Sequence, residues 1–115
     1  MATHSETRLL DTERLEAVLA EFARVRDWDR FHNPRNLLLA LSGEVGELAE
    51  IFQWKTDAEA ETIMSTDEAE HVRQEVSDVF LYLMRIAMVL GIDLDAAVRA
   101  KIEMNAKKYP AKIQG

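Results

Sequence analysis

Two pairs of acidic residues are the part of this sequence best suited to chemistry. Glu44 and Glu47 stand three residues apart within an apolar segment, and Glu75 and Asp78 repeat that spacing farther along the chain. Residues three apart lie on one face of a helix. A buried carboxylate is costly unless it is paired, hydrogen-bonded or bound to a metal. The pattern predicts that each pair lies on a packing face, where its charge needs compensation.

A hard divalent cation would compensate these charges if antiparallel packing brought the two pairs together. Mg²⁺ prefers oxygen ligands and usually leaves positions open for water and substrate phosphates. The sequence has no cysteine, and His71 is the only histidine near the pairs, so softer metals fit less well. We therefore expect the two pairs to hold Mg²⁺, with Mn²⁺ as a substitute.

Two other interpretations of the acidic residues stay open. Most glutamates in helices are ordinary exposed carboxylates, and the chain would then be a non-catalytic helical oligomer that acts as a binding or regulatory module. Glu68 and His71 form an E-x-x-H pattern like that of di-iron carboxylate bundles. A di-iron oxidase is therefore a third hypothesis. It is the weakest, because those proteins carry the pattern on two helices and this sequence has it once.

Local signals predict the helices that must position these residues. With 4 Gly, 2 Pro and scattered β-branched residues, the chain is expected to be all-α. Asn33 followed by Pro34 is typical of a helix start, and Gly91 of a helix end. A short helical turn is expected at 58–64, in the loop 55–67. The expected helices run from about Thr12 to Arg26, from Pro34 to about Gln53, from a cap at Thr66 or Asp67 to Gly91, and from Asp93 or Asp95 to near Pro110.

These helices predict a four-helix bundle that assembles as an oligomer. The third expected helix is apolar on more than one face, so one of its faces should meet another subunit. The length of 115 residues suits one domain. We therefore expect residues 1–115 to form a single domain, with flexible tails at about 1–10 and 111–115.

Composition and charge narrow the class of protein. Apolar residues make up 48% and charged residues 30%, and no apolar run approaches the roughly 20 residues that cross a bilayer. The polar start has no signal-peptide core, and no cysteine is present for disulfides. The net charge of −7 argues against binding a nucleic-acid backbone. A cytoplasmic protein without membrane or nucleic-acid partners is expected.

The acidic motifs and their surroundings resemble a known family. The strings "GEVGELAEIFQW" and "EVSDVFLYL" are similar to the MazG-like all-α nucleoside triphosphate pyrophosphohydrolases. In finer detail "RDWDRFHNPRNLLLALSGEVGELAEIFQWK" and "KIEMNAKKYP" resemble the dCTP pyrophosphatase branch, over about residues 22–109. The resemblance implies Mg²⁺-dependent hydrolysis of a nucleoside triphosphate to a monophosphate and pyrophosphate, for nucleotide-pool housecleaning. It also implies a homotetramer built from dimers.

Carried onto this sequence, the resemblance assigns site residues. It makes Glu44, Glu47, Glu75 and Asp78 the metal ligands, and we choose Glu44 as the carboxylate that takes the proton of the attacking water. The resemblance also implies residues that contact the substrate. These are Trp28, His32, Trp54 and Tyr82 around the base, Lys101 and Tyr109 at the phosphates, and Asn105 at the base or sugar.

One position departs from the branch and bears on the substrate. Leu19 stands where animal members have a base-pocket histidine. The expected substrates are dCTP and related pyrimidine deoxynucleotides, 5-modified cytosines included. Leu19 leaves open both the preference for cytosine and the acceptance of 5-modified cytosines. With the same chemistry, dUTP, a broader set of deoxynucleotides or a phosphoribosyl nucleotide are alternative substrates.

Overall fold

The computed structural model describes residues 7–112, and all its regular elements in that range are helical. The tail positions 1–6 and 113–115 lie outside the described residues. The absence of strands from the described range agrees with the predicted all-α class. In chain order the elements are α2 (Glu13–Val25), α3 (Pro34–Phe52), α4 (Asp57–Glu61), the 3₁₀ helix η1 (Ile63–Ser65), α5 (Ala69–Leu90) and α6 (Leu94–Lys108).

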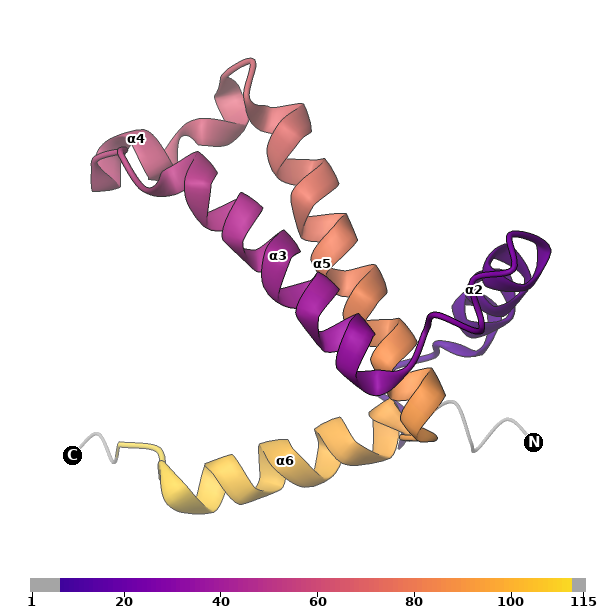
Figure 1. Ribbon diagram of the computed structural model, residues 1–115. Helices are drawn as coiled ribbons and strands as arrows, with labels where there is room; N and C mark the ends of the chain where they lie inside the picture. Colours follow the sequence, from indigo (N-terminus) through magenta and orange to yellow (C-terminus); the bar gives the residue numbers. More distant parts are fainter. Residues whose placement is uncertain (1–6, 113–115) are drawn as a thin grey trace.

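The framework is a hairpin of α3 and α5, which run antiparallel along each other (Figure 1). Two large side chains, Leu37 of α3 and Met84 of α5, are fully buried. Near the other end of the hairpin, Ile51, Ile63 and Val72 form a buried apolar cluster. Removing such surface from water is the main stabilising term of a small domain. Packing at both ends sets the register in which α3 faces α5.

The two remaining long helices are placed differently. α2 packs against α5, whereas α6 extends away from the hairpin (Figure 1). Every side chain of residues 99–112 is exposed. One chain by itself therefore does not close the expected four-helix bundle. No helix among the described residues is long and apolar enough to cross a bilayer.

Most of the predicted helix ends are confirmed. The Asn33 side chain accepts a hydrogen bond from the Asn36 N–H at 2.8 Å and caps α3, with Pro34 at the first position. Gly91 ends α5 in the left-handed conformation, with φ 69°, where a side chain would be strained. Asp93 caps α6.

The predicted cap of α5 at Thr66 or Asp67 was wrong. Glu68 occupies the N-cap position and its side chain makes no capping hydrogen bond. Thr66 instead stabilises the preceding turn, because its Oγ1 accepts from the Glu68 N–H at 3.2 Å and donates to the Ile63 carbonyl at 2.6 Å. The helix consequently starts at Ala69, slightly later than expected.

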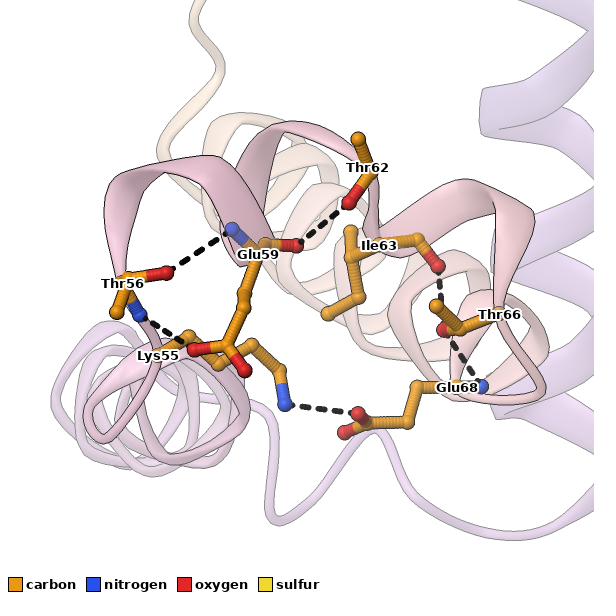
Figure 2. A network of polar contacts seen from close by, with 7 residues as sticks. All are labelled: Lys55, Thr56, Glu59, Thr62, Ile63, Thr66 and Glu68. Carbon is orange, nitrogen blue, oxygen red and sulfur yellow. Dashed lines mark hydrogen bonds and ion pairs between the residues drawn. The ribbon is translucent and has the colours of Figure 1, made fainter.

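The connection between α3 and α5 is more ordered than the predicted loop with a single turn. Thr56 and Glu59 form a reciprocal capping box at the start of α4 (Figure 2). Lys55 Nζ lies 2.7 Å from Glu68 Oε1, which ties the end of α3 to the start of α5. Glu68 thus forms an ion pair with Lys55, whereas the di-iron hypothesis would make it a metal ligand.

Asp95 holds the N-terminal segment against the start of α6. It is only 3% exposed, and its Oδ1 accepts from the Leu9 and Leu10 N–H groups at 2.6 and 3.0 Å. Its Oδ2 accepts from Arg99 Nε at 3.0 Å. The Leu10 N–H, then Leu9 and Arg99, lower the pKa of Asp95 to about 2. Leu9 and Leu10 are therefore anchored, although they fall within the expected tail.

Candidate functional site

Three carboxylates meet between the two helices of the hairpin. Glu44 belongs to α3, and Glu75 and Asp78 lie one turn apart on α5. Each offers an oxygen that lies within 4.8 Å of the oxygens of the other two. The antiparallel register thus brings one acidic turn of α3 opposite one acidic turn of α5, as the two motifs predicted for these three residues.

The carboxylate cluster, which consists of Glu44, Glu75 and Asp78, is partly buried and leaves two of its oxygens without a partner among the described residues. Glu75 is 8% exposed, and Oε2 of both Glu75 and Glu44 is buried without a hydrogen-bond partner among the described residues. Burial first, then the neighbouring Glu75 carboxyl and the charges of Glu47 and Asp78, raise the pKa of Glu44 to about 7. Orphaned buried oxygens of like charge fit a hard divalent cation, so the residues present suit Mg²⁺.

We expect the metal-free protein to become less stable as the pH rises from 4.5 to about 7. The pKa of Glu44 is raised to about 7 in the folded protein, above the ordinary value of 4.5 that it takes in the unfolded chain. Between these values the folded state binds more protons, so its stability falls with rising pH. Melting temperatures measured in EDTA would show this fall. It should be smaller in Glu44→Gln, which cannot ionise, and an equally steep fall in that variant would contradict the prediction.

Glu47, the fourth expected ligand, is not part of the carboxylate cluster. It lines a neighbouring open pocket of about 690 Å³ together with Trp54 and His71. Trp54 is 88% exposed there. His71 lies at the edge of the cluster, with its Nε2 3.5 Å from Glu75 Oε1. Glu47 is still close enough for its charge to raise the pKa of Glu44.

A second, more apolar pocket of about 290 Å³ adjoins the carboxylate cluster. Asp78 belongs both to the cluster and to the wall of this pocket. Trp28 meets Phe22 edge to face, with ring centroids 5.5 Å apart, and the His32 ring lies 5.8 Å from Trp28. We call this space the aromatic pocket; its lining residues are Leu19, Phe22, Ala23, Trp28, His32, Asp78, Leu81, Tyr82 and Arg85.

The turn after α2 places Trp28 and His32 in the aromatic pocket. Asp27 adopts a positive φ of 56°, and the Trp28 N–H then donates to the Ala23 carbonyl at 2.9 Å. Aspartate is among the few residues other than glycine that tolerate this conformation. The His32 N–H donates in turn to the Trp28 carbonyl at 3.1 Å. Local backbone bonds therefore hold both rings in position.

The expected base residues separate into two groups. Trp28, His32 and Tyr82 line the aromatic pocket, as does Leu19, the departure from the branch pattern. Trp54 lies at the other pocket, beside Glu47. One chain therefore does not bring the two tryptophans around a single base.

The expected phosphate and sugar residues lie on or just beyond α6. Lys101, Asn105 and Tyr109 are exposed, and α6 extends away from the hairpin that carries the carboxylate cluster (Figure 1). A single chain does not bring them to the cluster.

Sequence reasoning missed two residues, Arg85 and Asp29. Arg85 Nε donates to His32 Nδ1 at 3.0 Å, and its Nη2 donates to Asp29 Oδ1 at 2.6 Å. The available signal was a lone arginine in the largely apolar second half of α5. Such a charge needs a partner, but the sequence does not show where the partner lies.

Comparison with models of protein families shows the family to which this chain belongs. The model of the MazG-like family matches residues 39–114. The chain belongs to the MazG-like family. This confirms the family predicted from the acidic motifs, and the match includes all of the carboxylate cluster. The aromatic pocket takes much of its wall from α2 and the following turn, outside the residues that the MazG-like model matches.

Individual relatives of this MazG-like chain extend the comparison. The dCTP pyrophosphatase 1 of Homo sapiens is 50% identical over 109 residues, which cover 94% of this chain and 62% of the human protein. That of Bos taurus is 48% identical over 110 residues, covering 95% and 63%. The chain thus spans less than two thirds of the length of these curated relatives.

A solved structure shows the same fold. A pyrophosphatase from Archaeoglobus fulgidus DSM 4304 superposes with a TM-score of 0.80 at 39% sequence identity. The match covers 87% of this chain and 93% of the archaeal chain. The helical arrangement described above is therefore shared with this archaeal pyrophosphatase.

Proposed function

We propose that this chain is a Mg²⁺-dependent nucleoside triphosphate pyrophosphohydrolase of the cytoplasm. Its substrates would be dCTP and related pyrimidine deoxynucleotides, 5-modified cytosines included, which it hydrolyses to the monophosphate and pyrophosphate. The observation that carries the proposal is the carboxylate cluster beside the aromatic pocket, with Asp78 common to both. Mammalian dCTP pyrophosphatases that match over most of the chain support it.

Glu44, Glu75 and Asp78 would hold the metal, and Glu47 lies one helical turn beyond Glu44 to contribute a further carboxylate. When bound, Mg²⁺ neutralises charge on phosphate oxygens and lowers the pKa of water. A general base works best when its pKa is close to the working pH. Glu44 would act as this base through a carboxylate oxygen that the metal leaves free. Its pKa of about 7 is that of the metal-free cluster, and a bound cation would lower it.

The aromatic pocket would take the base. Its volume of about 290 Å³ is at the low end for ligand pockets, which suits one ring system better than a whole nucleotide. Trp28 offers a face on which a base can stack. Because Asp78 joins the pocket to the cluster, a base seated against Trp28 would direct its phosphates toward the carboxylates.

Exposed apolar faces support assembly into a homotetramer made of two dimers. Val76, Phe80 and Leu83 follow helical spacing on α5 and are all exposed, which agrees with the second apolar face expected from the sequence. Ile102 and Met104 of α6 are also exposed. Burial of such patches is a usual reason for subunits to associate. In an assembly, Lys101, Asn105 and Tyr109 could then contact a neighbouring chain's substrate.

The test of the activity is pyrophosphate release from dCTP, 5-methyl-dCTP, dUTP, dTTP, dATP, dGTP and CTP. Each is assayed with Mg²⁺, with Mn²⁺ and with EDTA, on a sample whose mass is measured by light scattering. We expect metal-dependent release that is strongest for the cytosine deoxynucleotides, from a species of four chains. A folded tetramer that releases pyrophosphate from none of them would favour the binding-module alternative.

A further inference from the structure

Arg85 links α5 to the turn that carries the aromatic pocket. Its side chain is only 13% exposed although it bears a charge. Its two hydrogen bonds reach His32 and Asp29, which lie 53 and 56 residues away in the sequence. A guanidinium with so little exposure is held in place by its hydrogen bonds. Those bonds in turn constrain the two side chains that accept them.

The bond from Arg85 determines where the hydrogen of the His32 ring lies. A guanidinium is always protonated and can only donate, so His32 Nδ1 must accept at 3.0 Å. A neutral ring then carries its single hydrogen on Nε2. Burial and the positive charge of Arg85 lower the pKa of His32, although Asp29 acts in the opposite direction, and this favours the neutral ring.

We propose that Arg85 is a positioning residue that fixes His32 as the Nε2–H tautomer, and that this N–H recognises a ring carbonyl of the substrate base. The inference rests on the proposed function of the aromatic pocket as the base site. Pyrimidine bases all carry such a carbonyl, whereas adenine has none. His32 would therefore select pyrimidines against adenine, without discriminating cytosine from uracil.

Asp29 completes the arrangement from the same turn. Its Oδ1 accepts from Arg85 Nη2 at 2.6 Å, which orients the guanidinium and balances its charge. The charge of Arg85 is thus balanced by Asp29, and the neutral His32 beside it lines the aromatic pocket. This agrees with a site for an uncharged base rather than for phosphate.

The tautomer can be measured directly by ¹⁵N NMR of the histidine rings at a pH where they are neutral. His32 should show a protonated Nε2 and an unprotonated Nδ1. In Arg85→Met, which keeps an unbranched apolar stem and loses the donor, the two tautomers should mix. Arg85→Lys should restore the wild-type pattern in part. Arg24→Gln, which breaks an exposed ion pair with Glu21 on α2, is the matched control and should leave it unchanged.

Recognition is tested with mononucleotides as probes, independently of catalysis. Addition of dCMP or dUMP should shift the His32 Nε2–H resonance, and dAMP should not. In kinetics, Arg85→Met should raise KM for dCTP and dUTP roughly 2- to 10-fold, the effect of one hydrogen bond, with kcat changed less.

The outcomes separate this inference from the proposed function. A hydrogen on Nδ1 in the wild type, or identical tautomers in wild type and Arg85→Met, would overturn it. An unshifted Nε2–H resonance with dCMP would overturn it as well. If the tautomer and the dCMP shift are found but no triphosphate is cleaved, the inference stands and the proposed activity fails.

Discussion

Replacing Glu75 by Gln should lower kcat/KM for the preferred nucleotide by on the order of 10²–10³-fold, because a metal ligand supplies several kcal/mol of charge stabilisation. The same change should raise the melting temperature of the metal-free protein. Glu75 is buried in the cluster, its Oε2 has no partner among the described residues, and Gln keeps its shape without the charge. Kinetics with Mg²⁺ and melting curves in EDTA measure the two effects.

Lower activity together with a higher melting temperature in EDTA would distinguish a metal-binding role of Glu75 from a purely structural role. Glu70→Gln is the matched control, since Glu70 lies on the same helix, is exposed and pairs with Arg73. It should change neither quantity appreciably. If Glu75→Gln kept full activity, or if it lost activity while also melting at a lower temperature in EDTA, the carboxylate cluster would not be the metal site proposed here.

Trp28→Ala should raise KM for the preferred nucleotide by about 5- to 150-fold, the range expected when one base loses an aromatic stacking partner. The carboxylate cluster lies on α3 and α5, whereas Trp28 lies on the turn after α2, so kcat should fall much less. Steady-state kinetics for dCTP and dUTP would show this division between KM and kcat.

Two further variants sharpen the test of Trp28. Trp28→Phe keeps an aromatic face and should retain most of the affinity. Phe31→Ala removes an exposed ring from the same turn that does not line the aromatic pocket, and it should leave KM close to the wild-type value. Equal effects of Trp28→Ala and Phe31→Ala would mean that the turn as a whole, rather than stacking on Trp28, supports binding.

The sequence by itself determined the helices and the family, because both depend on local signals. Asn33 with Pro34, Gly91 and Asp93 mark helix ends through their own backbone preferences and side-chain hydrogen bonds. Each acidic pair can be recognised in the sequence because its three-residue spacing puts both carboxylates on one helix face. The cap of α5 was misplaced because Thr66 satisfies the preceding turn rather than the helix. A threonine side chain can bond either the preceding turn or the start of the next helix, and its residue type alone does not show which bond forms.

Only the tertiary structure decided which of these residues meet. The register of α3 against α5 brings Glu44 to Glu75 and Asp78, while Glu47, one turn farther along, faces another pocket with Trp54. Spacing within a helix reports a shared face but carries no information about the partner's register.

The contacts of Arg85 and the position of α6 also came from the tertiary structure alone. Arg85 reaches His32 and Asp29 across more than fifty residues of chain, a pairing that depends on how α2 and its turn pack against α5. α6 has a clear helical sequence, yet it lies apart from the hairpin. Helix formation depends on neighbours in the chain, whereas the placement of a helix depends on which apolar faces find one another.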